Sequence, residues 1–339
     1  LDPEVAFSFD PTRFEDWTPV DSLILGRFQA HSLSFSANDE VTFTRVYDAA
    51  LAEYDESPAM GQPGFDAERD RRRGAAADLT RLIPAAKVAT HDGFPNIDSD
   101  GGTRSNGPGA RFAPGGERPR VPRELLDQAR RFFAPKIDGF GPHSFRRPSA
   151  GSNNWVVGPE HAGGKALLAG DQHLPLPNPS IFYPTHLVIP GELDVEGITF
   201  PGIPGVILGH NGNVAWTSTV VAHDANDVYL ENIVPCAAGG GDCVQFDGGE
   251  VAIETWDETI EIGALGTITE TKVVTYENVP HHGYIIPTIE NREVVPRSGN
   301  QALSVKYTGQ LVTQEVRAVF GLAVSRDLDE AFTALGDFG

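Results

Sequence analysis

Apolar and polar positions change their spacing about halfway along the chain. In residues 38–56, Val41, Val46, Ala50 and Tyr54 recur at roughly helical intervals after an Asn/Asp pair suited to a helix N-terminus. Residues 1–90 are therefore expected to be mostly helical. A second helix is expected over "PRELLDQARRFF", where Pro122 stands near the start.

From Asn153 onward the pattern favours strands. Short apolar or alternating runs are bounded by Gly and turn residues: "NNWVVG", "GKALLAG", "GIPGVILGHNGNVAWTSTVV", "DVYLENIV", "GEVAIETWDETIEI", "TITETKVVTYENV", "YIIPTIE" and "ALSVKYTG". A tight turn is expected at His210-Asn211-Gly212. Two helices follow, "TQEVRAVFGLAVS" and "DLDEAFTAL", the second with an Asp327/Glu330 capping box. Many strands followed by helices indicate a layered α+β domain rather than a parallel βαβ fold.

Between these halves the periodicity is lost. Residues 91–119 are dominated by Gly, Pro, Ser, Asn and Asp, which is typical of a loop or linker. Further on, "RRPSAGSNNWVVG" passes abruptly from linker to strand, with Ser152 at the boundary. Cleavage of the Gly151–Ser152 bond would give Ser152 a free α-amine with a pKa near ~7.7–8. One residue would then supply both nucleophile and base. The alternative is an ordinary loop or cap serine.

Charge narrows the classes of partner. The 339 residues carry 47 Asp and Glu against 26 Lys and Arg, for a net charge of −21. Such a surface repels phosphate backbones and anionic lipid, so nucleic acid and membrane partners are not expected. No apolar run reaches the ~18 residues of a membrane span. The sequence opens on Leu1 without a signal-peptide pattern, and we interpret this as an internal start.

Cys236 and Cys243 are the two cysteines, and both lie in "PCAAGGGDC". A disulfide across this Gly-rich loop would suit an exported protein, periplasmic or extracellular. Two unpaired thiols are the alternative.

Several of these segments together resemble the penicillin acylase family of N-terminal nucleophile hydrolases. The ordered set is "GSNNWVVG", "LLAGDQHLPLPNPSIFY", "PGIPGVILGHNGNVAWTSTVVAHDANDVYLEN" and "HHGYII", with a weaker match in "EDWTPVDSLILGRFQA". The resemblance implies a four-layer αββα core of the α+β class with a helical α-subunit part. It also implies an α/β heterodimer made from one precursor. Residues 1–90 would belong to the α-subunit, 91–151 to a spacer, and 152–339 to the nucleophile-bearing part.

The resemblance assigns roles around the cleavage site. Ser152 matches the nucleophile, and Gly151 the residue before the self-cleaved bond. In "DQHL", His173 matches the position that contacts the α-amine, whereas a buried structural histidine is the alternative. Gln172 is a candidate for the same region.

The resemblance also implies an oxyanion hole and an acyl pocket. The backbone N–H of Val220, just after "WTST", matches one oxyanion donor. A second donor, an asparagine, would lie beyond Gly339, so the sequence is expected to be part of a longer precursor. His210 is expected to be structural. Leu174, Pro175, Val220 and Trp155 are the expected apolar pocket wall.

"HDANDVY" resembles a family segment that holds calcium. Asp224, Asp227 and the carbonyl of Asn226 offer the hard oxygen ligands that Ca²⁺ prefers. A turn capped by carboxylates is the alternative. His281 and His282 suggest a transition metal, but "HHGYI" resembles a structural strand of the family. No organic cofactor is expected.

The resemblance implies an amidohydrolase acting on N-acyl amines. Penicillin-type side-chain amides are the family's default substrate, and acyl-homoserine lactones or lipopeptides are alternatives. The alternative from a different class is an unprocessed, noncatalytic secreted relative with a binding or structural role.

Overall fold

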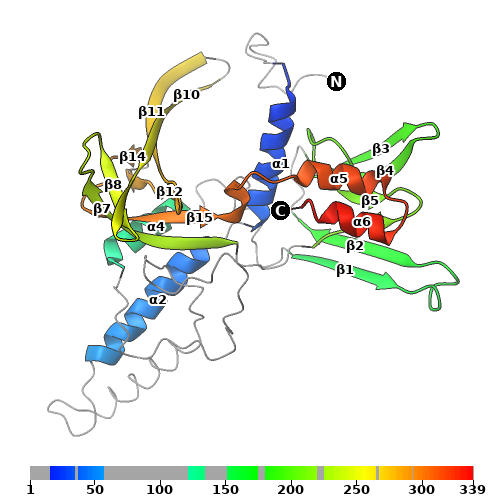
Figure 1. Cartoon of the computed structure of the whole chain (residues 1–339), viewed down its shortest axis with the longest axis horizontal. Coiled ribbons are helices and arrows are strands. Elements are labelled where there is room, and N and C mark those ends of the chain that lie inside the picture. The colour runs from blue at the N-terminus through cyan, green and yellow to red at the C-terminus, as the bar shows by residue number, and fades with distance from the viewer. Residues whose placement is uncertain are drawn as a thin grey trace, which may run out of the picture. The chain divides into compact units, whose positions relative to one another are not determined.

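A computed structural model describes residues 16–34, 37–56, 121–133, 151–174, 180–219, 225–264, 267–291 and 293–338 (Figure 1). The chain divides into two compact units that alternate along the sequence. The first comprises Leu1–Asp10, Ser36–Ala134 and Asp224–Thr308, and the second comprises Pro11–Phe35, Pro135–His223 and Gly309–Gly339. None of the helices in the described ranges is long and apolar enough to cross a bilayer.

Within its described residues, the first unit contains two helices and nine strands. Its elements are α2 (Ala37–Glu56), α4 (Arg123–Phe133), β7 (Asn226–Pro235), β8 (Asp242–Phe246), β9 (Gly249–Ala252), β10 (Glu254–Ala264), β11 (Thr267–Val279), β12 (Gly283–Ile285), β13 (Thr288–Glu290), β14 (Glu293–Val295) and β15 (Gln301–Tyr307). Seven strands form one sheet in the order β10-β11-β12-β15-β7-β8-β9, and β13 pairs with β14. All these pairs are antiparallel.

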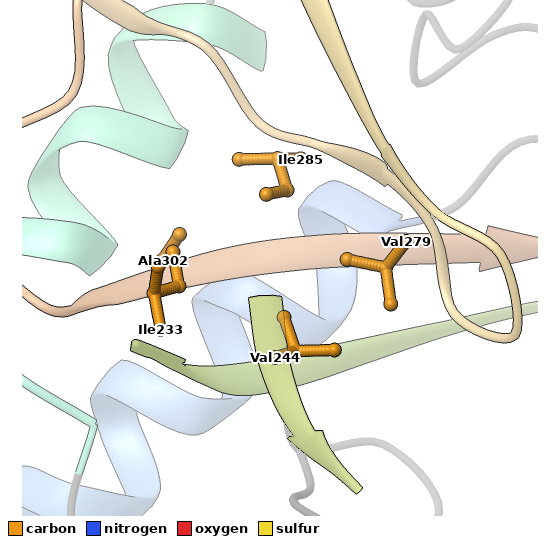
Figure 2. Close-up of a cluster of buried hydrophobic side chains, with 5 residues drawn as sticks. All are labelled: Ile233, Val244, Val279, Ile285 and Ala302. Carbon is orange, nitrogen blue, oxygen red and sulfur yellow. The ribbon is translucent and has the colours of Figure 1, made fainter. Parts of the chain in front are cut away.

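The core of the first unit lies on this sheet. One cluster consists of Ile233, Val244, Val279, Ile285 and Ala302 (Figure 2). Helix α4 packs against α2, β13 and β15, and buries Leu126, Ala129 and Phe133 at the spacing of one helical face. Both helices are confirmed close to their expected ranges.

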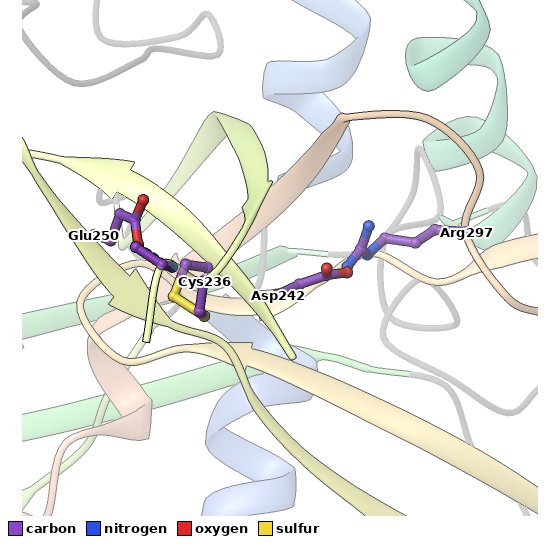
Figure 3. The surroundings of a disulfide bond; sticks show 6 residues. Cys236, Asp242, Glu250 and Arg297 are labelled. Carbon is purple, nitrogen blue, oxygen red and sulfur yellow. Dashed lines mark hydrogen bonds and ion pairs between the residues drawn. A yellow bond between two sulfur atoms is a disulfide. The ribbon is translucent and has the colours of Figure 1, made fainter. Parts of the chain in front are cut away.

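A disulfide closes the turn between β7 and β8. Cys236 and Cys243 are bonded, with Cα atoms 5.1 Å apart, which confirms the expected pairing. Next to it, the backbone N–H of Ala237 donates to Glu250 Oε2 at 2.8 Å. Arg297 pairs with Asp242 (Figure 3), and its Nε donates to Glu277 Oε1 at 3.0 Å. The disulfide and these ion pairs fix the β7–β8 end of the sheet.

The described part of the second unit contains three helices and two sheets. Its elements are α1 (Pro19–Ser34), β1 (Gly151–Val157), β2 (Leu167–His173), β3 (Tyr183–Ile189), β4 (Leu193–Thr199), β5 (Leu208–His210), β6 (Ala215–Trp216), α5 (Glu315–Val324) and α6 (Leu328–Leu335), and a 3-10 turn spans Thr308–Gln310. One sheet is β1-β2 and the other is β3-β4-β5-β6. Helix α5 packs against β4 and α6 (Figure 1), and Val195, Val206 and Ala323 form a buried cluster.

The expected α+β class is therefore confirmed, and its four-layer arrangement stays a prediction. Two continuous sequence patterns are interrupted. The run from 249 to 262 breaks at Ile253, and "YIIPTIE" breaks at Pro287, which has no N–H for a ladder. The expected capping box at α6 is half right. Asp327 accepts from the backbone of Glu330, but the Glu330 carboxylate accepts from the backbone N–H of Arg326, not Asp327.

Candidate active site

Ser152 lies inside strand β1. The sequence pattern indicated a strand from Asn153, but β1 begins at Gly151, so the bond expected to be cleaved is part of the strand. In the antiparallel β1–β2 pair, Ser152 is opposite Gln172 and Gly151 is opposite His173. Because side chains alternate between the two faces of a strand, Ser152 and Gln172 share a face and His173 points to the other.

The segment after β6 lies over the face that carries Ser152. Gln172 Nε2 donates to the carbonyl of Ser218 at 2.8 Å and to Thr217 Oγ1 at 3.3 Å. Thr217 Oγ1 in turn reaches Asn154 Oδ1 at 3.5 Å. These contacts bring "WTST", which precedes the expected oxyanion donor, onto the nucleophile strand.

Gly170 permits this close approach. A Cβ at this position would come within 2.0 Å of Thr217 Oγ1. Thr217, Asn154 and Gly170 were not singled out in the sequence. The available signal was the alternation of side chains between the two faces of β1 and β2. Once the register of the two strands is known, this alternation puts Asn154 and Gly170 on the face of Ser152.

His173 is placed differently from Gln172. Its Nε2 is 2.7 Å from Asp171 Oδ2, and its side chain is 42% exposed. The pair sits on the β2 face opposite Gln172. Contact between His173 and the α-amine of Ser152 stays a prediction.

Two of the four expected pocket residues, Trp155 and Leu174, lie in the described part of the chain. Trp155 is 52% exposed and lies on the β1 face opposite Ser152, by strand alternation. Leu174 is half-buried directly after β2. Pro175 and Val220 lie outside the described residues.

Two of the three expected calcium ligands begin β7. Asn226 is 2% exposed, Asp227 is exposed, and Asp224 lies outside the described residues. Sequence reasoning missed Glu40 on α2, a carboxylate only 1% exposed whose Oε2 accepts from the backbone N–H of Val228 at 2.7 Å. The available signal in the sequence was its position next to apolar Val41 in the first turn of the helix, close to the side that faces the core.

The remaining histidine candidates differ in their surroundings. His282 is buried, with Nδ1 2.9 Å from Glu231 Oε1, and Ser304 donates to the same oxygen. Its ring stacks on Tyr229 with centroids 3.7 Å apart. Burial, and next the neighbouring His282, lower the pKa of His281 to about 4. His210, expected in a turn, is the last residue of β5 and pairs with Glu196 at 3.0 Å.

The sequence as a whole matches one family. The profile described as penicillin amidase covers residues 3–339, so the chain belongs to the penicillin amidase family.

Two curated relatives illustrate the match. The acyl-homoserine lactone acylase QuiP of Pseudomonas aeruginosa is 41% identical over 85 residues, which cover 25% of this chain and 10% of the relative. The penicillin acylase 2 proenzyme of Pseudomonas sp. strain SE83 is 35% identical over 119 residues, covering 33% of this chain and 15% of the relative. The matched segments thus span a small part of those longer proteins. A thermostable penicillin G acylase from Alcaligenes faecalis superposes at a TM-score of 0.36, with 24% identity over 47% of this chain and 26% of the other.

Proposed function

We propose that the protein is an amide-cleaving acylase whose nucleophile is the N-terminal Ser152 released by cleavage of the Gly151–Ser152 bond. Ser152 Oγ attacks the acyl carbonyl of an N-acyl amine while its own α-amine accepts the hydroxyl proton. The C–N bond breaks, the amine leaves with that proton, and water hydrolyses the acyl-enzyme. The backbone N–H of Val220 is proposed to stabilise the oxyanion.

The contact between Gln172 and Ser218 is the observation that carries this proposal. It ties the segment that leads to Val220 to the residue directly opposite Ser152. The strand paired with that of Ser152 therefore contacts Thr217 and Ser218, which precede the proposed donor in the sequence. Membership of the penicillin amidase family supports the same chemistry.

Mass spectrometry of the full-length protein tests the cleavage. We expect two fragments, the second beginning with Ser152, which assemble as an α/β heterodimer. Ser152→Ala should leave one chain, whereas Ser180→Ala, at an exposed serine of the same unit, should be cleaved normally. Cleavage at this bond in Ser152→Ala, or an intact and inactive wild-type chain, would contradict the proposal. The second result would favour a noncatalytic binding protein.

The α-amine predicts a pH profile. Because only the neutral amine accepts a proton, kcat should rise with pH through the amine pKa, nominally ~7.7–8. A profile that stays flat from about pH 5 to 9, with chemistry limiting, would contradict a catalytic α-amine.

We propose N-acyl amines with an apolar acyl group as substrates. The two curated relatives carry the names of an acyl-homoserine lactone acylase and a penicillin acylase, and both substrate types share an acyl amide. A panel of phenylacetyl, phenoxyacetyl and fatty-acyl amides, including acyl-homoserine lactones, separates them. Preference for charged short acyl groups such as glutaryl would contradict the apolar pocket.

Calcium is proposed as a structural ion at the start of β7. Asp224, Asp227 and the carbonyl of Asn226 would hold it, and Glu40 would add a carboxylate from α2. The buried Glu40 fits this set because its carboxylate lies at Val228, directly after Asp227. Calcium would supply charge compensation and fix this strand end.

Chelation tests the ion. Its removal should lower the melting temperature, and Ca²⁺ should restore it. Glu40→Gln should reduce the change in melting temperature between the calcium-free and calcium-loaded protein. Asp48→Asn, on the same helix, is the control and should keep the full change. No thermal shift and no calcium by elemental analysis would leave the aspartates as turn caps.

We propose a periplasmic or extracellular location. The Cys236–Cys243 disulfide supports it, because such bonds persist in oxidising compartments.

A further inference from the structure

Three potential metal ligands form a row across the four-stranded sheet of the second unit. His186 on β3 is the Cα partner of Glu196 on β4, and Glu196 is the partner of His210 on β5. Directly paired residues of an antiparallel sheet project from the same face. Asp194, two residues before Glu196, shares that face. The sheet therefore presents two imidazoles and two carboxylates together.

The strands that carry the row approach closely. Gly197 and Gly209 are paired beside it, and a Cβ on either would lie 2.1 or 2.2 Å from a backbone oxygen of the other strand. Only glycine allows this spacing. On the neighbouring pair of the same two strands, Glu196 Oε1 lies 3.0 Å from His210 Nε2.

The row faces away from the helix that packs on this sheet. Val195, which alternates with Asp194 and Glu196, is buried with Val206 and Ala323 of α5 on the opposite face. His186, Glu196 and His210 instead line an open hollow of about 520 Å³. Their side chains are 52%, 52% and 53% exposed, so an ion has access from solvent.

We propose that this row binds a divalent transition metal ion of the Zn²⁺ type through the Nε2 atoms of His186 and His210 and the Glu196 carboxylate. Two histidines and one glutamate are a common zinc ligand set. Imidazole nitrogens favour Zn²⁺, Co²⁺ and Ni²⁺ over Ca²⁺ and Mg²⁺. The Cα atoms of His186 and His210 stand two strands apart, roughly 10 Å. The two imidazoles can therefore converge above the central Glu196.

In the structure, the proposed metal ligands take part in two separate histidine–carboxylate pairs. His186 Nε2 is 2.7 Å from Asp194 Oδ1, and His210 Nε2 pairs with Glu196. Within the described ranges, no three His, Cys, Asp or Glu side chains yet surround one point. Metal binding would displace the proton between each imidazole and its carboxylate to solvent. It would require rotation of exposed side chains, without a change in the strands. This site shares no residue with the proposed calcium ligands, and its proposal does not rest on the proposed acylase activity.

Zinc titration of the chelator-treated full-length protein tests the proposal. We expect one saturable Zn²⁺ equivalent by calorimetry in excess Ca²⁺, and a visible Co²⁺ spectrum showing nitrogen ligation. Loss of even an outer-shell partner of a metal site typically costs ~10–100-fold in metal affinity. Because His210 and Glu196 are proposed as direct ligands, His210→Asn and Glu196→Gln should each weaken Zn²⁺ binding at least ~10-fold. His161→Asn is the matched control, because His161 forms an exposed histidine–acid pair with Glu160 at 3.8 Å in the same unit.

The outcomes separate a metal site from surface ion pairs. No saturable Zn²⁺ binding, or equal affinity in His210→Asn, Glu196→Gln and His161→Asn, would overturn the proposal. Circular dichroism and melting temperature establish that each variant is folded. If His210→Asn does not fold, Glu196→Gln decides, because it keeps the shape of the side chain.

Discussion

Asn211 uses both ends of its side-chain amide to join a turn to a helix. Its Nδ2 donates to the carbonyls of Leu322, Ala323 and Ser325 at 3.2, 3.1 and 2.7 Å, at the C-terminal end of α5. Its Oδ1 accepts from the backbone N–H groups of Asn213 and Val214, both at 3.0 Å. One side chain therefore binds carbonyls at the end of the helix, where partners within the helix run out, and closes the β5–β6 turn.

We expect Asn211→Ala to lower the free energy of unfolding by about 2–3 kcal/mol. The substitution leaves several partly buried backbone groups without partners, at about 1–3 kcal/mol for such a loss. Urea denaturation measures the change. Asn213→Ala is the control, since Asn213 is exposed and contributes its backbone N–H to these contacts. Equal midpoints for the two variants would contradict this role of Asn211.

His281 should make stability depend on pH. Burial and His282 lower the pKa of His281 to about 4, compared with about 6.5 for a free side chain. As pH falls from about 6.5 to about 4, the unfolded chain takes up a proton here that the folded chain does not. This contribution to stability is complete above pH 6.5 and is lost through that window.

His281→Phe should therefore flatten the pH dependence of the urea midpoint between pH 7 and 4.5. The new ring can pack against Phe246, whose centroid lies 3.8 Å from the His281 ring. The buried Nε2 atom, which has no hydrogen-bond partner among the described residues, would be removed. His161→Gln is the control. Because His161 is exposed, this variant should keep the wild-type pH dependence of the urea midpoint. An unchanged slope in His281→Phe would show that other groups dominate.

Helix α4 lies within residues 91–151, the range expected to be spacer, yet it is packed as part of the first unit. Leu126, Ala129 and Phe133 are 2%, 1% and 5% exposed. Asp127 lies 3.6 Å from Arg45 of α2, and the backbone N–H of Val121 reaches Asp48 at 3.3 Å. Removing this helix would expose apolar surface on α2 and the sheet.

We expect the mature protein to retain residues 121–133 after processing. Burying side chains of this size stabilises by about 1.5–3 kcal/mol each, which opposes release of the helix. Peptide mapping of the purified, processed protein checks this. As a companion measurement, Leu126→Ala should cost about 2–5 kcal/mol, and Glu124→Ala, at an exposed position of the same helix, should cost little. A processed protein without these peptides would contradict the prediction.

Local sequence patterns predicted most helices and strands. The contacts around the candidate site depend on residues that are distant in sequence, and local patterns do not predict them. The α2 and α4 helices and most strands follow from periodicity, because each element buries one face. The partnership of Gln172 with Ser218 depends on the β1–β2 register and on Gly170, and no local spacing encodes either. Glu40 was missed for the same reason, because its backbone partner Val228 is distant in sequence.

At the scale of the whole molecule, acidic groups greatly exceed basic ones. The net charge is −21, and the described ion pairs compensate part of it locally, as where Arg297 contacts both Asp242 and Glu277. Two further carboxylates are buried. Glu40 accepts from the backbone N–H of Val228, and Glu231 contacts His282 and Ser304. Other described carboxylates, such as Asp227, Glu254 and Glu270, are exposed, and mutual repulsion among surface charges of one sign opposes the compact state.

Salt should therefore stabilise the protein near neutral pH. Raising ionic strength from 0.01 to 0.1 M shortens the Debye length from about 30 to about 10 Å, which screens repulsion between distant surface carboxylates but much less between buried pairs. We expect the melting temperature in NaCl to rise over this range at pH 7. Near pH 4.8, the isoelectric point of the sequence, the same salt step should have little effect because the net repulsion is gone. Differential scanning calorimetry at both pH values, with calcium held constant, measures the difference. An equal response at the two pH values would show that salt acts through another route, such as a specific ion site or a change in apolar hydration.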